Sequence, residues 1–118
     1  MVPNSGYSQE WIKRNYDQYL RSEHWQDVRR RFWKSKLNDG FCYGCGDEGL
    51  LNLHHKTYKR VGRERLNDLV LLCTPCHTAV HEWVTDGRSL WQATRKLERK
   101  ISRMGKEKAY LWFHKHSA

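Results

Sequence analysis

Apolar residues recur at helical spacing through the first third of the chain. The first set follows Ser8, a residue that can cap a helix, and comprises Trp11, Ile12, Tyr16, Tyr19 and Leu20. A second set follows Ser22 and comprises Trp25, Val28 and Phe32. A turn at Asn38-Asp39-Gly40 ends this region. The pattern predicts a helical segment over residues 8–40, after a disordered start at residues 1–7.

After residue 41 the helical spacing gives way to shorter runs. Residues 50–58 suit a strand, the charged residues 59–67 suit a loop, and the apolar run 69–72 suits a second strand. The two strands are expected to pair as a hairpin with a long connection. From Pro75 the pattern is helical again, until Asp86-Gly87 stops it. We therefore expect residues 41–86 to form a core of strand, loop, strand and helix.

The last amphipathic pattern begins near Ser89 and ends at Gly105. Its apolar positions recur at intervals of four and three residues, at Leu90, Thr94, Leu97, Ile101 and Met104. The helix is short for a coiled coil, so this stripe is expected to serve packing rather than a partner. We predict a basic helix and an aromatic tail within residues 87–118, with the tail at residues 110–116.

The composition indicates one small domain with little apolar core. Only 38% of the 118 residues are hydrophobic, so the chain needs a further source of stability. No apolar run approaches the length of a membrane span, and the N-terminus lacks the features of a signal peptide. A cytoplasmic protein is expected, in which paired cysteines indicate a metal before a disulfide.

The charge balance favours a polyanionic partner. There are 22 basic and 13 acidic residues, which gives a net charge of +9 with neutral histidines. Nucleic acid is the commonest partner of so basic a chain, and no membrane partner is expected. Each single cation can equally belong to a solvated surface, so the charge alone does not establish binding.

Four cysteines form two CxxC pairs, at Cys42 and Cys45 and at Cys73 and Cys76. A spacing of two residues lets both sulfurs of a pair approach one ion, and two pairs complete a tetrahedral site. Thiolates favour zinc, and a site with four sulfur ligands leaves no open position. The predicted hairpin lies between the pairs. We therefore predict a structural Zn²⁺ that contributes to folding.

Four of the seven histidines lie in the same region, at His54, His55, His77 and His81. The last two are four residues apart on a predicted helix, so they share one face. Three imidazoles can bind one divalent cation, while a fourth accepts a proton near neutral pH. Adjacent residues of a regular strand point to opposite faces, which complicates a joint use of the first two. The alternative is that these histidines are structural.

The combined pattern resembles the HNH endonucleases, and in particular their small stand-alone bacterial and phage members. The resemblance covers residues 19–83 and rests on Tyr19-Leu-Arg-Ser22-x-x-Trp25, Cys42-x-x-Cys45, Leu53-His54-His55-Lys-Thr-Tyr58, Glu64, Asp68-Leu-Val-Leu-Leu-Cys73-x-x-Cys76-His77 and His81. It implies a small α+β fold with a ββα-metal (His-Me finger) core and a structural zinc. Helices at the N-terminus and the C-terminus would flank this core.

The resemblance also implies roles for individual residues. His55 becomes the general base, and the ligands of one catalytic divalent metal (Mg²⁺, Mn²⁺, Ni²⁺ or Zn²⁺) become His54, His77 and His81. The middle catalytic position of the family pattern falls at Asp68, where the carboxylate would hold the imidazolium of His55 or reach the metal through water; Asn67 is the alternative. An aspartate there accepts hydrogen bonds but cannot donate an amide N–H.

The implied activity is metal-dependent hydrolysis of DNA phosphodiester bonds with low sequence specificity. The cations expected to bind the DNA backbone are Arg29, Arg30, Lys56, Lys59, Arg60, Arg95 and Lys96. A larger phage or restriction machine is a further possible partner, in the cytoplasm of a bacterium or a phage-infected host cell. The alternatives are a non-catalytic, zinc-stapled module that binds nucleic acid and an accessory protein of a phage packaging machine.

Overall fold

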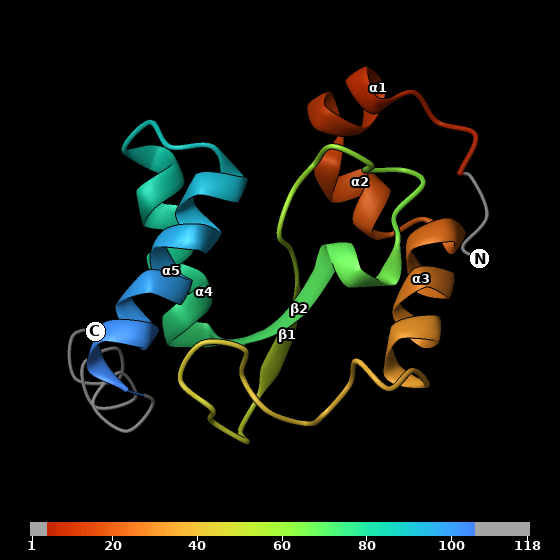
Figure 1. Ribbon diagram of the computed structural model, residues 1–118. Helices are drawn as coiled ribbons and strands as arrows, with labels where there is room; N and C mark the ends of the chain where they lie inside the picture. Colours follow the sequence, from red (N-terminus) through yellow and green to blue (C-terminus); the bar gives the residue numbers. More distant parts are fainter. Residues whose placement is uncertain (1–4, 106–118) are drawn as a thin grey trace. The chain divides into compact units, whose positions relative to one another are not determined.

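A computed structural model describes residues 5–105 (Figure 1). Its elements are α1 (Gln9–Arg14), α2 (Tyr16–Leu20), α3 (Glu23–Trp33), β1 (Leu51–His55), the 3-10 helix η1 (Leu66–Asp68), β2 (Leu69–Cys73), α4 (Thr74–Thr85) and α5 (Leu90–Met104). The two strands form an antiparallel sheet. The predicted α+β class, with a hairpin, a following helix and flanking helices, is confirmed. The predicted disorder of residues 1–4 and the aromatic tail lie outside the described residues.

Three serines begin helices as the sequence predicts. The hydroxyl oxygens of Ser8, Ser22 and Ser89 each accept a hydrogen bond from a backbone N–H three residues later, at 3.1–3.2 Å. Each bond satisfies one donor that the first turn of a helix leaves without a partner. The predicted first helix divides at Asn15, whose backbone is not helical and whose side-chain amide donates to the Trp11 carbonyl at 2.9 Å. This side-chain bond competes with the regular helical pattern.

The described chain divides into two compact units. Unit 1 contains the residues up to Asp39 together with Thr57–Leu69, and unit 2 contains Gly40–Lys56 together with the residues from Val70 onward. The long connection between the strands thus belongs with the N-terminal helices, and α5 belongs with α4 and the sheet. This grouping differs from the predicted segments at residues 8–40, 41–86 and 87–118, because it joins parts of the chain that are distant in sequence.

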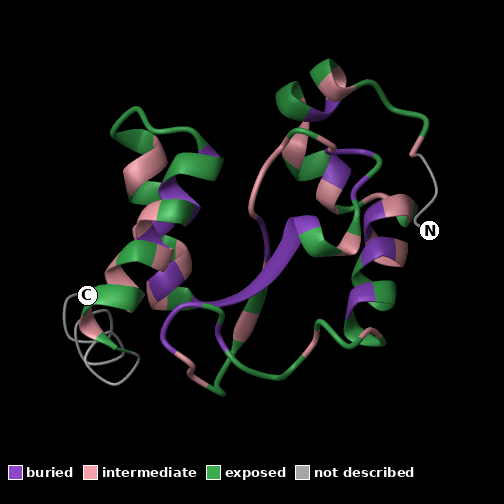
Figure 2. Cartoon of the chain, in the orientation of Figure 1, coloured by how far each residue is buried: buried purple, intermediate pink, exposed green. Residues whose placement is uncertain are grey.

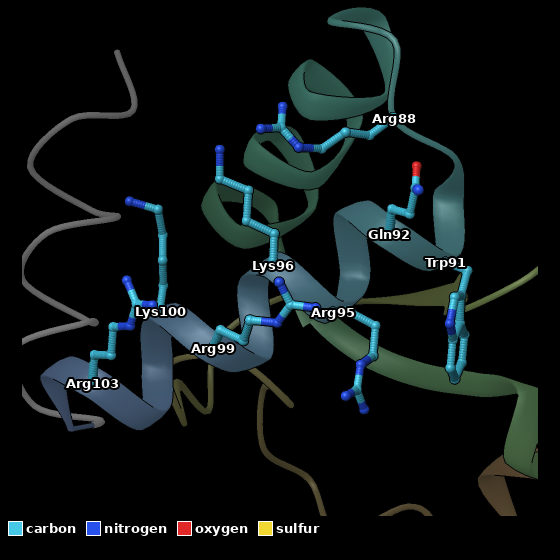
Figure 3. A pocket seen from close by; sticks show the side chains of 8 residues that line it. All are labelled: Arg88, Trp91, Gln92, Arg95, Lys96, Arg99, Lys100 and Arg103. Carbon is cyan, nitrogen blue, oxygen red and sulfur yellow. The ribbon is translucent and has the colours of Figure 1, made fainter.

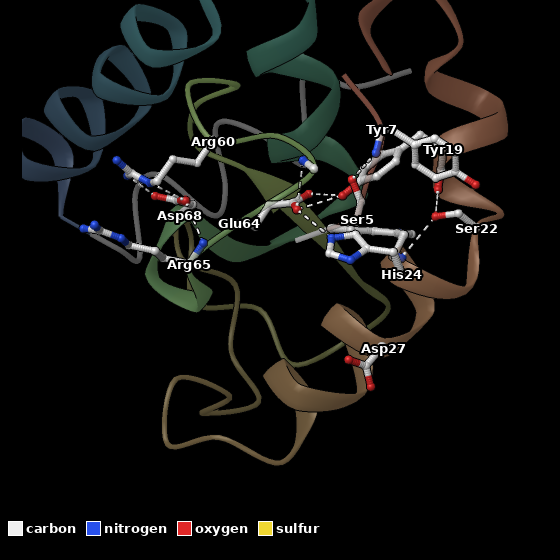
Figure 4. Close-up of polar contacts among 12 residues, drawn as sticks. Ser5, Tyr7, Tyr19, Ser22, His24, Asp27, Arg60, Glu64, Arg65 and Asp68 are labelled. Carbon is white, nitrogen blue, oxygen red and sulfur yellow. Dashed lines mark hydrogen bonds and ion pairs between the residues drawn. The ribbon is translucent and has the colours of Figure 1, made fainter. Parts of the chain in front are cut away.

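Unit 1 has buried segments in its helices and in the connection between the strands (Figure 2), and its apolar core encloses the carboxylate of Glu64. Its fully buried apolar side chains are Ile12, Tyr19, Val28, Phe32 and Val61. Glu64, which is 2% exposed, lies among them. Its oxygens accept from the Tyr19 hydroxyl at 2.5 and 2.7 Å and from the Gly62 N–H at 3.1 Å, and they lie 3.2 Å from His24 Nε2 (Figure 4). These bonds fix the connection between the strands to α2 and α3.

The connection also passes close to the start of the chain. Gly62 adopts a φ of +93°, and a Cβ there would lie 2.5 Å from Ile12 Cδ1, so only glycine fits. The Gly62 carbonyl accepts from the Ser5 N–H at 2.7 Å, and the Tyr7 ring stacks on Trp11 with centroids 4.7 Å apart. Residues 5–7, which fall within the segment expected to be disordered, therefore make defined contacts.

Unit 2 is built around the part of β2 from Val70 onward, and all five residues of this strand are buried. The apolar faces of α4 and α5 pack together, and they bury Val80, Leu90, Ala93 and Leu97 (Figure 2). The first CxxC pair approaches this core closely, because a Cβ at Gly44 would lie 3.0 Å from Cys76 Sγ and 3.3 Å from Leu97 Cδ2. The core of unit 2 therefore joins the cysteine-bearing loop to both helices.

Candidate metal centres and nucleic-acid surface

The two CxxC pairs converge in unit 2. The first pair lies in the loop before β1, Cys73 ends β2, and Cys76 lies in the first turn of α4. The four sulfur atoms lie within 4.8 Å of one another, and the residues are 0–4% exposed. None of the four forms a disulfide. A closed group of four thiol ligands suits a structural metal such as zinc, as the spacing predicts.

Backbone donors support negative charge on this cluster. The N–H groups of Gly44 and Cys73 each donate to Cys42 Sγ at 3.3 Å. Hydrogen bonds from Cys45 and the other two thiols hold the pKa of Cys42 well below its ordinary value. Cys42 is therefore prepared for the thiolate form that metals bind, whereas hydrogen bonds to Cys42 and Cys45 raise the pKa of Cys73 and, with Cys73, that of Cys76, so these two thiols would lose their protons to the metal.

Three histidines form a second cluster in unit 2. His54 comes from β1, and His77 and His81 come from successive turns of α4. One ring nitrogen of each lies within 4.8 Å of the others, and the Nε2 atoms of His77 and His81 are 2.9 Å apart. Burial decreases across the cluster, from His54 at 3% exposure to an exposed His81. The donor set fits a divalent metal, and the exposed side leaves room for further ligands.

Burial keeps these imidazoles neutral. It is the main reason that the pKa of His54 lies well below its ordinary value, with a smaller contribution from the charges of His77 and His81. Burial, followed by the charge of His81, lowers the pKa of His77 to about 4. Burial also lowers the pKa of His81. At neutral pH their lone pairs are therefore available to a metal without the prior loss of a proton.

His55 is buried at 2% exposure but does not belong to the three-histidine group. This separation agrees with the alternation of side chains along a strand. It leaves His55 outside the candidate ligand set, as the resemblance implies. Its role as a general base stays a prediction.

Asp68 lies in unit 1 and is 3% exposed. Its carboxylate forms a two-point ion pair with the Arg60 guanidinium, in which Arg60 Nε donates to Oδ2 at 2.8 Å, and Oδ2 also accepts from the Arg65 N–H at 3.0 Å (Figure 4). Burial alone would raise the pKa of Asp68, but these bonds hold it below the ordinary value. The neighbouring Asn67 is exposed. Arg60, predicted to bind DNA, is therefore engaged by a carboxylate of its own unit.

The other predicted DNA-binding cations are dispersed over both units. In unit 1, Arg29 donates to Gln26 at 3.5 Å, and Arg30 pairs with Asp27 at 3.4 Å. The side chain of Lys59 in unit 1 is exposed, and that of Lys56 in unit 2 is half-buried. In unit 2, Arg95 pairs with Glu98 at 3.5 Å, and Lys96 Nζ lies 4.6 Å from the centroid of the Trp83 ring.

A larger cationic surface on α5 was only partly anticipated. Eight residues line one hollow, and we call this surface the α5 basic face (Figure 3). They are Arg88, Trp91, Gln92, Arg95, Lys96, Arg99, Lys100 and Arg103. Six of these eight residues are cations and none is acidic. Partial burial, followed by the charges of Arg88 and Lys100, lowers the pKa of Lys96. The recurrence of basic residues at helical intervals could have revealed the whole face from the sequence.

A comparison with known families matches residues 42–82 to the HNH endonucleases. No curated protein and no solved structure matches the chain. Across residues 5–105, no helix is long and apolar enough to cross a membrane. The family match spans both CxxC pairs and the three-histidine cluster. Residues 42–82 therefore match the HNH endonuclease family, which confirms the resemblance seen in the sequence.

Proposed function

We propose that this protein is a metal-dependent endonuclease that hydrolyses DNA phosphodiester bonds. The observation that carries the proposal is the convergence of three imidazole nitrogens within 4.8 Å inside an HNH domain. A purely structural role would not require that arrangement beside a complete four-cysteine site. The exposed edge at His81 gives substrate a way to reach the cluster.

The proposed metal ligands are His54, His77 and His81. A divalent metal bound there supplies charge stabilisation at a phosphate oxygen and at the leaving oxygen. Among the residues that the structure describes, this group contains no carboxylate. Imidazoles suit Ni²⁺ and Zn²⁺ better than Mg²⁺, so we expect the tightest binding from the two former ions.

Two further residues have distinct proposed roles. His55 accepts the proton of the attacking water, and the product carries a 5′ phosphate as in the resembling family. Asp68 is a positioning residue, because its carboxylate is engaged by Arg60 and by the Arg65 N–H. It orders the connection between the strands instead of taking part in proton transfer.

DNA affinity is proposed to come mainly from phosphate contacts. The α5 basic face offers the densest group of cations, and Arg29, Arg30, Lys56 and Lys59 add to the attraction. A non-catalytic module that binds nucleic acid would use the same face. Membership of a phage or restriction machine and a cytoplasmic location stay predictions.

Plasmid cleavage tests the proposal. The wild-type protein and the variants His55→Ala and His77→Ala are incubated with supercoiled plasmid in Mg²⁺, Mn²⁺ or Ni²⁺. We expect cleavage by the wild type only, with unchanged zinc content and circular dichroism in all three proteins. Equal cleavage by His55→Ala would remove that residue from the mechanism. Absence of cleavage by the wild type in every metal, with DNA binding retained, would favour the non-catalytic module.

A further inference from the structure

The buried end of the three-histidine cluster is joined to α5 by a short hydrogen-bond chain. His54 Nε2 lies 3.2 Å from Thr94 Oγ1, and Thr94 Oγ1 donates to the Leu90 carbonyl at 2.9 Å. Both linked side chains are almost inaccessible, with 3% exposure for His54 and 1% for Thr94. Water therefore cannot replace either partner readily.

The two hydrogen bonds can run in only one direction, from His54 to the Thr94 hydroxyl and from that hydroxyl to the Leu90 carbonyl. A threonine hydroxyl carries a single hydrogen, and a backbone carbonyl can only accept. Once Thr94 donates to Leu90, its oxygen can only accept from His54, so Nε2 carries the imidazole proton. The reverse arrangement would leave two oxygens 2.9 Å apart with no hydrogen between them. The remaining nitrogen of neutral His54, Nδ1, then holds the lone pair.

We propose that Thr94 is a positioning residue of the imidazole metal site, which fixes His54 so that Nδ1 is its metal-binding atom. This inference rests on the proposed function, because it assigns a support to the same candidate site. Metal-binding histidines generally donate their second ring N–H to an outer partner, which sets the tautomer and the ring orientation. Here that partner belongs to α5, which lies beyond the family match at residues 42–82. The site is therefore incomplete without the C-terminal helix.

The two histidines of α4 would bind a metal through the other ring nitrogen, Nε2. His77 and His81 present Nε2 to each other at 2.9 Å. A metal held by the cluster would thus take Nε2 from both helical histidines and Nδ1 from the strand histidine. This mixed pattern separates the proposal from one in which Thr94 merely fills space in the core.

The first test compares Thr94→Val with Thr94→Ser. Valine retains the shape but removes the hydroxyl, whereas serine retains the hydroxyl. Ni²⁺ and Zn²⁺ affinities are measured by calorimetry on protein whose four-cysteine site is already filled with zinc. We expect Thr94→Val to bind about 10–100-fold more weakly, as outer-partner losses typically do, and Thr94→Ser to stay close to wild type. Equal affinities for Thr94→Val and wild type would overturn the proposal.

The second test needs no variant and so remains decisive if Thr94→Val fails to fold. Nitrogen NMR of the wild type, at a pH where imidazole is neutral, should show His54 protonated at Nε2. After Zn²⁺ is added to the second site, its Nδ1 resonance should carry the metal-induced shift. A metal-bound Nε2 on His54, or no metal binding at this cluster, would overturn the assignment. Neither readout involves DNA, so a protein that binds metal in this way but cuts nothing would contradict only the nuclease proposal.

Discussion

The buried carboxylate of Glu64 allows a quantitative prediction about the connection between the strands. Replacing it in Glu64→Ala removes the acceptor for the Tyr19 hydroxyl and for the Gly62 N–H. The same change removes the partner of His24 Nε2. The site is 2% exposed, so these groups would gain little access to water in the variant. Burial, followed by the hydrogen bond to Glu64 and the charge of Glu64, raises the pKa of Tyr19 well above its ordinary value.

The expected loss of stability follows from the donors left without partners. Each buried donor that loses its acceptor costs about 1–3 kcal/mol. Two donors, on Tyr19 and Gly62, therefore give about 2–6 kcal/mol, before any cost of the cavity. A small domain has only about 5–15 kcal/mol in total, so the variant should be close to unfolding. Tyr19→Phe removes one hydroxyl and should cost only about 1–2 kcal/mol.

Urea unfolding, followed by circular dichroism at saturating zinc, measures this difference. Glu10→Ala is the matched control, because Glu10 forms an ion pair with Arg14 in which both side chains are about three-quarters exposed. An exposed pair of this kind contributes about 0.5 kcal/mol or less. If Glu64→Ala were no more destabilised than Glu10→Ala, the buried network would not hold the connection as we infer.

Three further predictions concern zinc, DNA and pH. Chelating the structural zinc should melt unit 2, because such a metal supplies about 10–16 kcal/mol; an unchanged melting curve in zinc-free protein would contradict this. Arg99→Ala/Arg103→Ala should weaken DNA binding and lower the slope of log affinity against log salt by about 0.9 per lost phosphate contact. The matched Lys34→Ala/Lys36→Ala variant should keep the larger slope of the wild type. Equal slopes for the two double variants would exclude the α5 basic face as the DNA-binding surface. The pKa of Asp68 is lowered from 3.8, so its stabilising effect is complete above that value and is lost as pH falls through the native pKa. The stability difference between wild type and Asp68→Asn, measured by urea unfolding, should therefore shrink below pH 3.8, and a constant difference would refute the ion-pair explanation.

The features that sequence predicts well here are those set by local spacing. A serine before an apolar repeat marks a helix start, and Ser8, Ser22 and Ser89 all form the expected bond. The spacing within each CxxC pair brings two sulfur atoms close together, and the spacing of His77 and His81 puts two imidazoles on one face of a helix. Such patterns depend on a few consecutive dihedral angles, so tertiary packing has little opportunity to override them.

The features that sequence missed depend on contacts between distant residues. Glu64 meets Tyr19 across 45 positions, and no local pattern links the two. The sequence places the basic Arg60 among the predicted DNA-binding cations, yet the carboxylate of Asp68 engages it. The helical spacing places Thr94 in the apolar stripe of its helix, which predicts its burial but not the hydrogen bond between its hydroxyl oxygen and His54.

The two candidate metal centres are parts of one folding unit. Cys76 and His77 are consecutive in α4, so the helix turn that supplies a sulfur ligand also supplies an imidazole ligand. Leu97 of α5 lies beside the first CxxC pair, because a Cβ added at Gly44 would lie 3.3 Å from Leu97 Cδ2. One turn earlier, Thr94 contacts His54. Loss of zinc would release the start of α4 and the packing of α5 together. The imidazole cluster should therefore lose its geometry when the thiolate site is emptied, although no sulfur ligand belongs to it.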